Sequence, residues 1–322
     1  MNKLIKKDRS ITDIFQEQKF TFSAELIPPR NGDSVDSVFE KATVLAGAGV
    51  DFISITKGAG GSLRSGTIPI SFVIKEKIGV PIVAHITCME MNHKEIENYL
   101  IDHSYLGITN VLALRGDPPT GVLTEYKAGE DQYQYAYQLI EKITELNEGK
   151  YILRKGYDKD SVDYHVGQKL DFTIGAAVYP QPEDGNVERN VGYLIEKINR
   201  GATFGITQMI YSPEDFGAFM QLLKKKGYNI PILPGMRVIQ KTSQAEFLMR
   251  NFKINIPQQY LDILKKENNE NEIKEYIIDL SLKFKKAGAQ GAHFFVMEEQ
   301  LLVADIIKEL RTQSKGGKSA RT

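Results

Sequence analysis

The stretch Val111-Leu112-Ala113-Leu114-Arg115-Gly116-Asp117-Pro118-Pro119 decides how the rest of the chain is interpreted. Its first four residues form an apolar run, which is typical of a strand buried on both faces of a parallel sheet. The two prolines that follow Asp117 cannot continue such a strand. Because α/β proteins carry their chemistry where parallel strands end, Arg115 and Asp117 are candidates for a functional site. The alternative is structural: the two side chains pair with each other or cap the next turn.

The composition indicates a globular protein without an evident affinity for nucleic acid. The 322 residues are 42% hydrophobic and 25% charged, which is enough apolar content for a large core. Lys plus Arg and Asp plus Glu both total 41, so the net charge is zero and gives no signature of nucleic-acid or anionic-membrane binding. The single cysteine excludes an internal disulfide and fits a reducing compartment. Without a membrane-spanning run or a signal peptide, we expect a cytoplasmic protein.

Apolar runs that are typical of strands alternate with helical segments along the chain. The expected strands are, in order, Phe20–Ile27, Asp51–Thr56, Pro81–Thr87, Thr109–Arg115, Phe172–Tyr179, Phe204–Ile210, Ile230–Pro234 and Gly291–Met297. This alternation requires parallel strands joined by crossover helices. Eight such units in a chain of this length favour a closed (β/α)8 TIM barrel over an open doubly wound sheet. No composition break marks a second domain, so we expect a single α/β domain.

Three segments are expected within that single domain. Residues 1–19 form a lead-in with a short polar helix, residues 20–312 form the catalytic barrel, and residues 313–322 form a flexible tail. Residues 147–170 are polar and lack clear periodicity. They are too long for an ordinary connection between a helix and a strand, so we interpret them as an insertion or a mobile loop.

Polar residues recur at or just before the ends of the first six expected strands. They are Glu25, Thr56, His85 with Thr87, Arg115 with Asp117, Tyr179 and Gln208. Each has a structural explanation when taken alone, such as a paired carboxylate or a hydrogen-bonded core histidine. A barrel brings these strand ends to one face around one cavity. The repetition over six strands therefore favours a functional site there.

Two other features do not support a nucleotide fingerprint or a metal site. The run Gly58-Ala59-Gly60-Gly61 has Leu63 where a dinucleotide fingerprint needs a third glycine. We interpret it as a flexible loop whose backbone can approach a ligand closely. Cys88 and the five scattered histidines lack the spacing of metal ligands, so no metal is expected.

Five motifs together resemble the methylenetetrahydrofolate reductase family. They are Ala24-Glu25-Leu26-Ile27-Pro28-Pro29-Arg30, His85-Ile86-Thr87-Cys88, Leu112-Ala113-Leu114-Arg115-Gly116-Asp117, Ile206-Thr207-Gln208 and Ile232-Leu233-Pro234-Gly235, in the family's order. The resemblance extends from about Phe20 to Leu310 and implies a (β/α)8 barrel with FAD across the carboxyl ends of the strands. It also implies hydride transfer from NADH or NADPH to FAD, and then to 5,10-methylenetetrahydrofolate, in a ping-pong reaction at one shared site.

The resemblance also implies roles for individual residues. Glu25 matches the general acid, which protonates N10 while the five-membered ring of the substrate opens. Asp117 matches a catalytic residue that contacts the folate near the flavin, where a carboxylate can accept from the pterin 2-amino and N3–H groups. Gln208 and Gln244 match folate-contacting glutamines. Flavin-binding positions are matched by Thr56, Ala59, His85, Arg115, Gly116, Asp117, Tyr135, Ala136, Tyr179 and Lys197.

The chain departs from the family pattern at several positions. Gln181-Pro182-Glu183-Asp184 follows the Tyr-Pro of the fifth strand where the family has a histidine, and Asn190 replaces an aspartate. Glu299 stands where the family has an arginine that serves the glutamate tail of the substrate. Two alternatives follow: a relative that uses little or no FAD or depends on a partner protein, and a non-catalytic folate- or flavin-binding subunit. Retention of Glu25 argues against the second, because binding alone needs no acid. A homo-oligomer is a possible assembly for such a barrel.

Overall fold

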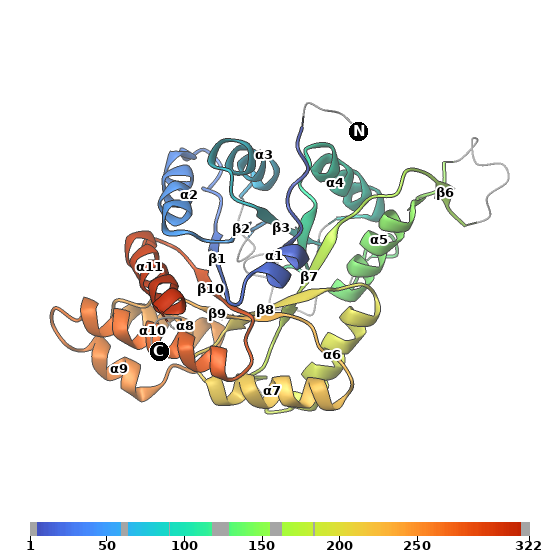
Figure 1. Ribbon diagram of the computed structural model, residues 1–322. Coiled ribbons are helices and arrows are strands. Elements are labelled where there is room, and N and C mark those ends of the chain that lie inside the picture. The colour runs from blue at the N-terminus through green and yellow to red at the C-terminus, as the bar shows by residue number, and fades with distance from the viewer. Residues whose placement is uncertain are drawn as a thin grey trace, which may run out of the picture.

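Parallel strands close into a ring at the centre of the computed structural model, which describes residues 5–58, 64–89, 91–117, 129–154, 163–182 and 184–316 (Figure 1). In these residues the ring has eight strands: β1 Thr21–Leu26, β2 Phe52–Ile55, β3 Ile82–Thr87, β4 Asn110–Leu114, β7 Thr173–Val178, β8 Phe204–Met209, β9 Ile232–Met236 and β10 Gly291–Phe295. Their order is β1-β10-β9-β8-β7-β4-β3-β2, and the pairings are parallel. The predicted (β/α)8 barrel is therefore confirmed.

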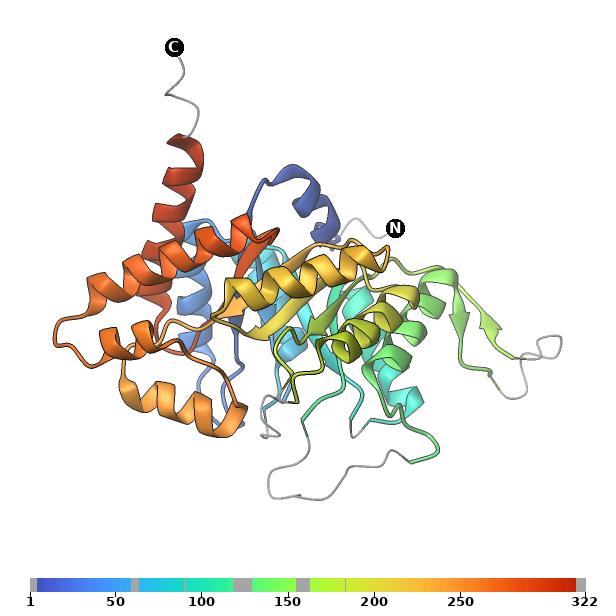
Figure 2. The ribbon, with the colours of Figure 1, turned by 90° about the horizontal axis from the view of Figure 1, so that it is seen from below.

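Helices cover the outside of the barrel (Figures 1 and 2). They are α2 Asp36–Ala48, α3 Thr67–Val73 continued by the π-helix η2 Ile74–Ile78, α4 His93–Tyr105, α5 Ala136–Glu148, α6 Val187–Asn199, α7 Pro213–Lys225, α8 Thr242–Phe252, α9 Gln258–Leu264, α10 Glu270–Lys286 and α11 Gln300–Gly316. The last helix thus runs into the predicted tail, which was expected to begin at residue 313. No helix in the described ranges is both long and apolar enough to cross a membrane.

A short helix from the lead-in segment, α1 Ile11–Glu17, closes the amino end of the barrel. Its apolar side chains join the inner core, whose members are Ile11, Ile14, Phe15, Phe52, Val83, Leu112, Phe204, Ile206 and Leu233. Asn110, the first residue of β4, accepts a hydrogen bond from the Ile11 backbone N–H at 3.0 Å and donates to the Arg9 carbonyl at 2.9 Å. The barrel is consequently sealed at this end, and its cavity opens only toward the carboxyl ends of the strands.

The insertion expected at 147–170 contains a small antiparallel pair, β5 Lys150–Tyr151 and β6 His165–Val166, which projects beside α5 (Figure 1). A buried ion pair anchors its base: the Lys142 ammonium lies 2.9 Å from Glu97. Glu97 also accepts a hydrogen bond from the Ile152 backbone N–H at 2.9 Å. This carboxylate therefore ties α4, α5 and the insertion together. Residues 155–162 lie outside the described residues.

The seal formed by α1 gives a stability prediction. Phe15 is buried and its ring contacts Phe52 and Phe204, with centroids at 6.5 and 5.9 Å. Replacing it in Phe15→Ala leaves a cavity in the inner core, so we expect a loss of about 3–5 kcal/mol in urea unfolding. Phe252→Ala removes a ring that is 45% exposed on α8 and is the control, with an expected change within about 0.5 kcal/mol. Equal stability of the two variants would mean that α1 is not part of the cooperative fold.

A buried carboxylate beside α1 gives a pH-dependence prediction. Asp8 accepts backbone hydrogen bonds from Ile82 at 2.7 Å and Arg9 at 2.9 Å, and burial raises its pKa to about 6 from 3.8. The folded chain then keeps this proton to higher pH than the unfolded chain, so the group's stabilisation is present below pH 4 and is lost as pH rises through 6. We expect the stability of the wild type relative to Asp8→Asn to fall by about 3 kcal/mol between pH 4 and pH 7. A pH-independent difference in urea unfolding would contradict this.

Candidate functional site

The predicted site residues that end the first six strands lie at the carboxyl face of the barrel, opposite α1. Glu25 is in β1, Thr56 follows β2, and His85 and Thr87 are in β3. Arg115, Gly116 and Asp117 follow β4, Tyr179 follows β7, and Gln208 is near the end of β8. The structure therefore brings these residues to one face, as the repeated pattern predicts. Ala59 lies outside the described residues.

Glu25 lies between two buried histidines inside the barrel. Its Oε2 is 3.4 Å from Nε2 of His85 and 3.8 Å from Nε2 of His293, and its side chain is 14% exposed. These separations allow strong electrostatic coupling, but the geometry of neither contact is that of a hydrogen bond. Burial lowers the pKa of His85, with Glu25 opposing this shift. Burial thus favours the neutral form of His85.

Sequence reasoning did not identify His293 as a site residue. It lies in β10 next to Ser23 of β1, and its Nδ1 is 2.8 Å from the Ser23 hydroxyl. The available signal was a histidine inside an otherwise apolar strand, but such residues usually have only a structural role in the core. Only the closure of the barrel, which pairs the last strand with the first, places His293 beside Glu25.

The inside of the barrel is apolar toward α1 and carries polar atoms toward Glu25. Of the buried side-chain atoms without a hydrogen-bond partner in the described residues, four lie on the strands around Glu25: Ser54 Oγ, Thr56 Oγ1, His85 Nε2 and His293 Nε2. They belong to or directly follow β2, β3 and β10. Nearer α1 the strands contribute apolar side chains, among them Phe52, Leu112 and Ile206. Because buried polar atoms are rarely left unpaired, these atoms indicate that this side of the cavity receives a polar ligand or water.

The turn after β4 requires glycine at position 116. Gly116 has a φ of +98°, and a Cβ there would lie 3.1 Å from Met89 and 3.2 Å from Thr87. A side chain would therefore be both strained and crowded. The Arg115 carbonyl accepts hydrogen bonds from the Met89 N–H at 2.8 Å and the Cys88 thiol at 3.5 Å. These contacts fix the turn from which Arg115 and Asp117 extend into solvent at the mouth.

A lysine approaches the end of β7 from α6. Lys197 donates to the Ala177 carbonyl at 2.8 Å, and its ammonium lies 5.8 Å from the centre of the Tyr179 ring. Burial lowers its pKa to about 8, and it has no carboxylate partner in the described residues. The Asn190 amide donates to the Tyr179 carbonyl at 2.8 Å, so it supports this strand end. An uncompensated cation at a cavity edge is suited to an anionic ligand.

The remaining predicted flavin positions lie where α5 begins. Tyr135 precedes the first residue of that helix, Ala136, and its ring is half-exposed and stacked on Tyr137 with centroids 5.4 Å apart. The Gln138 side chain accepts hydrogen bonds from the Gln134 and Tyr135 N–H groups at 2.9 Å. The helix start is thereby ordered, and the exposed Tyr135 ring offers a flat surface to a ligand.

The two predicted folate glutamines have different surroundings. Gln208 lies within an irregularity in the β8–β9 pairing, between Ile206 and Met209, and its Oε1 accepts a hydrogen bond from the Met209 N–H at 2.8 Å. Gln244 has its Oε1 bound to the Gln240 and Lys241 N–H groups at 2.9 and 3.1 Å. Its Nε2 donates to Glu299 at 3.3 Å. Gln244 therefore serves the start of α8 in this structure, which its sequence position alone did not reveal.

Glu299, the departure from the family pattern, is almost fully buried. It accepts hydrogen bonds from Arg237 at 2.9 Å and from the Met297 and Glu298 N–H groups at 3.0 Å. Arg237 at the end of β9 thus neutralises a carboxylate at the position where the family has a cation. The loop after β10 therefore carries the ion pair of Glu299 and Arg237, which has no net charge, where the family has a positive charge.

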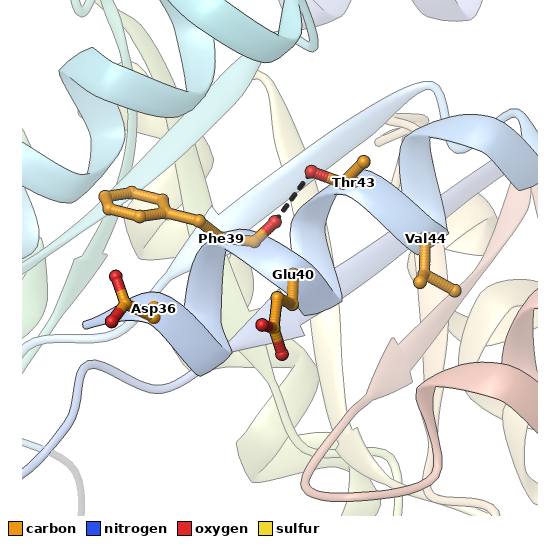
Figure 3. A pocket seen from close by; sticks show the side chains of 5 residues that line it. All are labelled: Asp36, Phe39, Glu40, Thr43 and Val44. Atoms are coloured by element: carbon orange, nitrogen blue, oxygen red, sulfur yellow. Dashed lines mark hydrogen bonds between the residues drawn. The ribbon is translucent and has the colours of Figure 1, made fainter. Parts of the chain in front are cut away.

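Two hollows lie near the carboxyl face. One has a volume of about 540 Å³ and is lined by Asp36, Phe39, Glu40, Thr43 and Val44, all from α2. Figure 3 shows that these residues occupy neighbouring turns of this one helix. It contains no residue of a strand end, so we do not include it in the site. The other has a volume of about 390 Å³, and its lining includes Leu26 of β1 and Val296 and Met297, which follow β10. We call this second hollow the rim pocket.

The chain is similar to several methylenetetrahydrofolate reductases. It is 29% identical over 302 residues to methylenetetrahydrofolate reductase 1 of Schizosaccharomyces pombe, covering 91% of this chain and 46% of that protein. It is 30% identical over 293 residues to methylenetetrahydrofolate reductase (NADH) 1 of Arabidopsis thaliana, covering 90% and 47%. The chain thus spans about half the length of these relatives.

The fold and the family agree with these similarities. An uncharacterised protein from Clostridium thermocellum, described as binding two copies of 5-methyl-5,6,7,8-tetrahydrofolic acid, superposes with a TM-score of 0.60 at 14% identity. The alignment covers 94% of this chain and 98% of that one, which supports the barrel fold. The sequence pattern of the methylenetetrahydrofolate reductase family matches residues 10–311. The chain therefore belongs to the methylenetetrahydrofolate reductase family.

Proposed function

We propose that this chain reduces 5,10-methylenetetrahydrofolate to 5-methyltetrahydrofolate with electrons from NADH or NADPH that pass through FAD. The observation that supports this most is Glu25, a carboxyl group with little exposure at the carboxyl end of β1 that lies within 4 Å of two histidines. Membership of the family supports the reaction, and the Clostridium thermocellum protein of similar fold is described as binding the product. The single cysteine fits a reducing compartment, and we propose a cytoplasmic enzyme. The proposed reaction would belong to one-carbon metabolism, and its methylated product would serve methionine biosynthesis.

The described residues fit a flavin along β2, β3, β4 and β7. Thr56 Oγ1 and His85 Nε2 are buried without hydrogen-bond partners, as expected of groups that bind a polar ring edge. Lys197 is a cation without a carboxylate partner and suits the pyrophosphate, while Tyr135 and Tyr179 offer exposed rings. When bound there, FAD supplies the two-electron carrier between the nicotinamide and the folate.

Glu25 would act on the folate as a proton donor. The substrate's C–N10 bond breaks as Glu25 delivers a proton to N10, which leaves an iminium at N5 that is ready to accept a hydride. Asp117 is suited to accept the pterin 2-amino and N3–H groups, and Gln208 can satisfy its mixed donor and acceptor edge. The apolar core packed against α1, including Leu112 and Ile206, excludes water from the amino end of the barrel below this site.

The visible absorption spectrum of the purified protein tests this proposal. A flavin band that bleaches with NADH or NADPH under anaerobic conditions, and returns on adding methylenetetrahydrofolate, is the expected result. A protein that takes up no FAD but still reduces the folate would instead support the flavin-independent relative, in which the loop after Tyr179 differs from the family. A protein that binds folate without any turnover would support the non-catalytic subunit.

Glu25→Gln separates the two half-reactions. We expect folate reduction to fall by about 10²–10⁴-fold, because the amide cannot protonate N10. Electron transfer from NAD(P)H to an artificial flavin acceptor should be unchanged, since that step needs no acid at this position. Glu40→Gln, an exposed carboxylate on α2, is the matched control and should leave both rates unchanged. Unaltered folate turnover in Glu25→Gln would remove this residue from the mechanism.

The lowered pKa of Lys197 leads to a prediction of how the affinity for FAD depends on pH. Its pKa of about 8 means that the ammonium loses its charge as pH rises above 8. A bound pyrophosphate would hold the proton, so we expect the FAD dissociation constant to be constant below pH 8 and to rise by up to about tenfold per pH unit above it. Lys197→Arg should retain tight binding at pH 9.5, and Lys197→Met should bind weakly at every pH. Flavin fluorescence titrations measure this, and equal pH profiles for the wild type and Lys197→Met would contradict it.

A further inference from the structure

His293 is a fully buried imidazole whose position in the barrel is fixed by three neighbours. Ser23, its register partner on β1, lies 2.8 Å from Nδ1, and the Phe295 ring packs at nearly a right angle to the imidazole, with centroids 5.1 Å apart. Gly235, its partner on β9, leaves room for Phe295, because a Cβ there would lie 2.4 Å from that ring. This group is separate from the rim pocket, whose lining includes neither Glu25 nor His293. The imidazole is therefore held with its Nε2 toward Glu25.

The hydrogen bond of Ser23 determines which ring nitrogen of His293 carries the proton. The Ser23 hydroxyl has two acceptors in reach, Nδ1 of His293 at 2.8 Å and the Ala292 carbonyl at 3.5 Å. The hydroxyl has a single proton and the shorter contact is the stronger, so it donates to Nδ1. A neutral imidazole that accepts at Nδ1 has its hydrogen at Nε2. Nε2 is therefore a buried donor, and in the part of the chain that the structure describes it has no hydrogen-bond partner.

Glu25 is the acceptor that lies in front of this donor. Its Oε2 is 3.8 Å from Nε2 of His293, and a side-chain rotation that shortens this separation by about 1 Å makes a normal hydrogen bond. Catalytic hydrogen bonds are often long before substrate binds and shorten in the substrate complex. His85 approaches the same oxygen, with its Nε2 at 3.4 Å. Both histidines thus face Oε2, which leaves Oε1 as the oxygen that can carry a proton to a substrate.

We propose that His293 is a positioning residue for Glu25, held by Ser23 so that its Nε2–H donates to Oε2. This inference rests on the proposed function, because it assumes that Glu25 protonates N10 of the folate. The hydrogen bond turns the carboxyl group so that Oε1 presents its proton to the substrate. As this proton moves to N10 and the C–N10 bond breaks, negative charge develops on Glu25 and the bond to Oε2 becomes stronger. His293 keeps its own proton throughout.

Separate measurements of the two half-reactions in the flavin-loaded protein test this role. His293→Asn keeps an amide near the position of Nδ1 but removes the donor to Glu25. Reoxidation of the reduced flavin by saturating methylenetetrahydrofolate should therefore slow by about 10–100-fold, as expected for a lost hydrogen bond to a charged group. His293→Gln can place an amide N–H near the position of Nε2 and should recover most of this rate. Flavin reduction by NAD(P)H and the dissociation constant for the folate should stay within about twofold in both variants.

Ser23 supplies a second variant that leaves the imidazole in place. Ser23→Ala removes the hydroxyl that fixes the proton at Nε2, so we expect folate reduction to slow by about tenfold. Ser71→Ala is the matched control, because Ser71 is a fully buried serine on α3 whose hydroxyl has no hydrogen-bond partner in the described residues. Both half-reactions should be unchanged in this control. If His293→Asn does not keep the wild-type melting temperature, the comparison of these two serine variants decides, and equal folate turnover in them would overturn the proposal.

A double variant tests whether His293 acts through Glu25. Since Glu25→Gln already removes the acid, adding His293→Asn should slow folate reduction no further. Additional slowing by the factor seen in the single His293→Asn variant would overturn the proposal, because the imidazole would then act independently of Glu25.

The remaining outcomes separate this inference from the proposed function. Normal folate reduction by His293→Asn, together with slow reduction by Glu25→Gln, would overturn the inference and leave the reductase intact. Equal slowing of both half-reactions by His293→Asn, with weaker folate binding, would mean that the residue supports only the fold, and would overturn it as well. A wild type that does not reduce the folate contradicts the proposed function itself, and the inference fails with it.

Discussion

The register between parallel strands is the constraint on which this site depends. Glu25 is opposite Ser54 on one side and Phe295 on the other, and His85 is opposite Leu112. Side chains alternate between the cavity and the helices along each strand, so a shift of one residue in β1 would turn Glu25 toward α2 and place Leu26 inside. The helix α1 packs Ile11, Ile14 and Phe15 against inward side chains of the strands, so a change of register would disrupt this packing. The chemistry at the top therefore depends on packing at the bottom.

The fold was predictable because its signals are local. The strands are apolar runs, the first six with a polar residue at or near the end, and the alternation with helices leaves few topologies. The carboxyl-face positions of Glu25, His85 and Gln208 followed from that topology. The position of His293 was not predictable from the periodicity, because it reaches Glu25 only through closure between the first and last strands. The engagement of Gln244 by Glu299, and of Glu299 by Arg237, joins residues about 55 and 62 positions apart, and no local pattern contains such a contact.

The cavity beside Glu25 carries the polar groups that a cofactor would need. On the side of β2, β3 and β7 it presents unpaired hydroxyl and imidazole atoms and the cation Lys197, which suit a large, flat, anionic cofactor. Lys197 gives this side of the cavity a local positive charge even though the whole chain carries no net charge.

The reactivity of Cys88 toward thiol reagents can be used to measure motion at the site. The thiol is fully buried, it donates to the Arg115 carbonyl, and burial raises its pKa to about 11. At neutral pH it is therefore both protonated and shielded from reagents. Since it is the single cysteine in the sequence, any reaction with a thiol reagent records separation of the end of β3 from the Gly116 turn, and the modification rate gives the population of that open form.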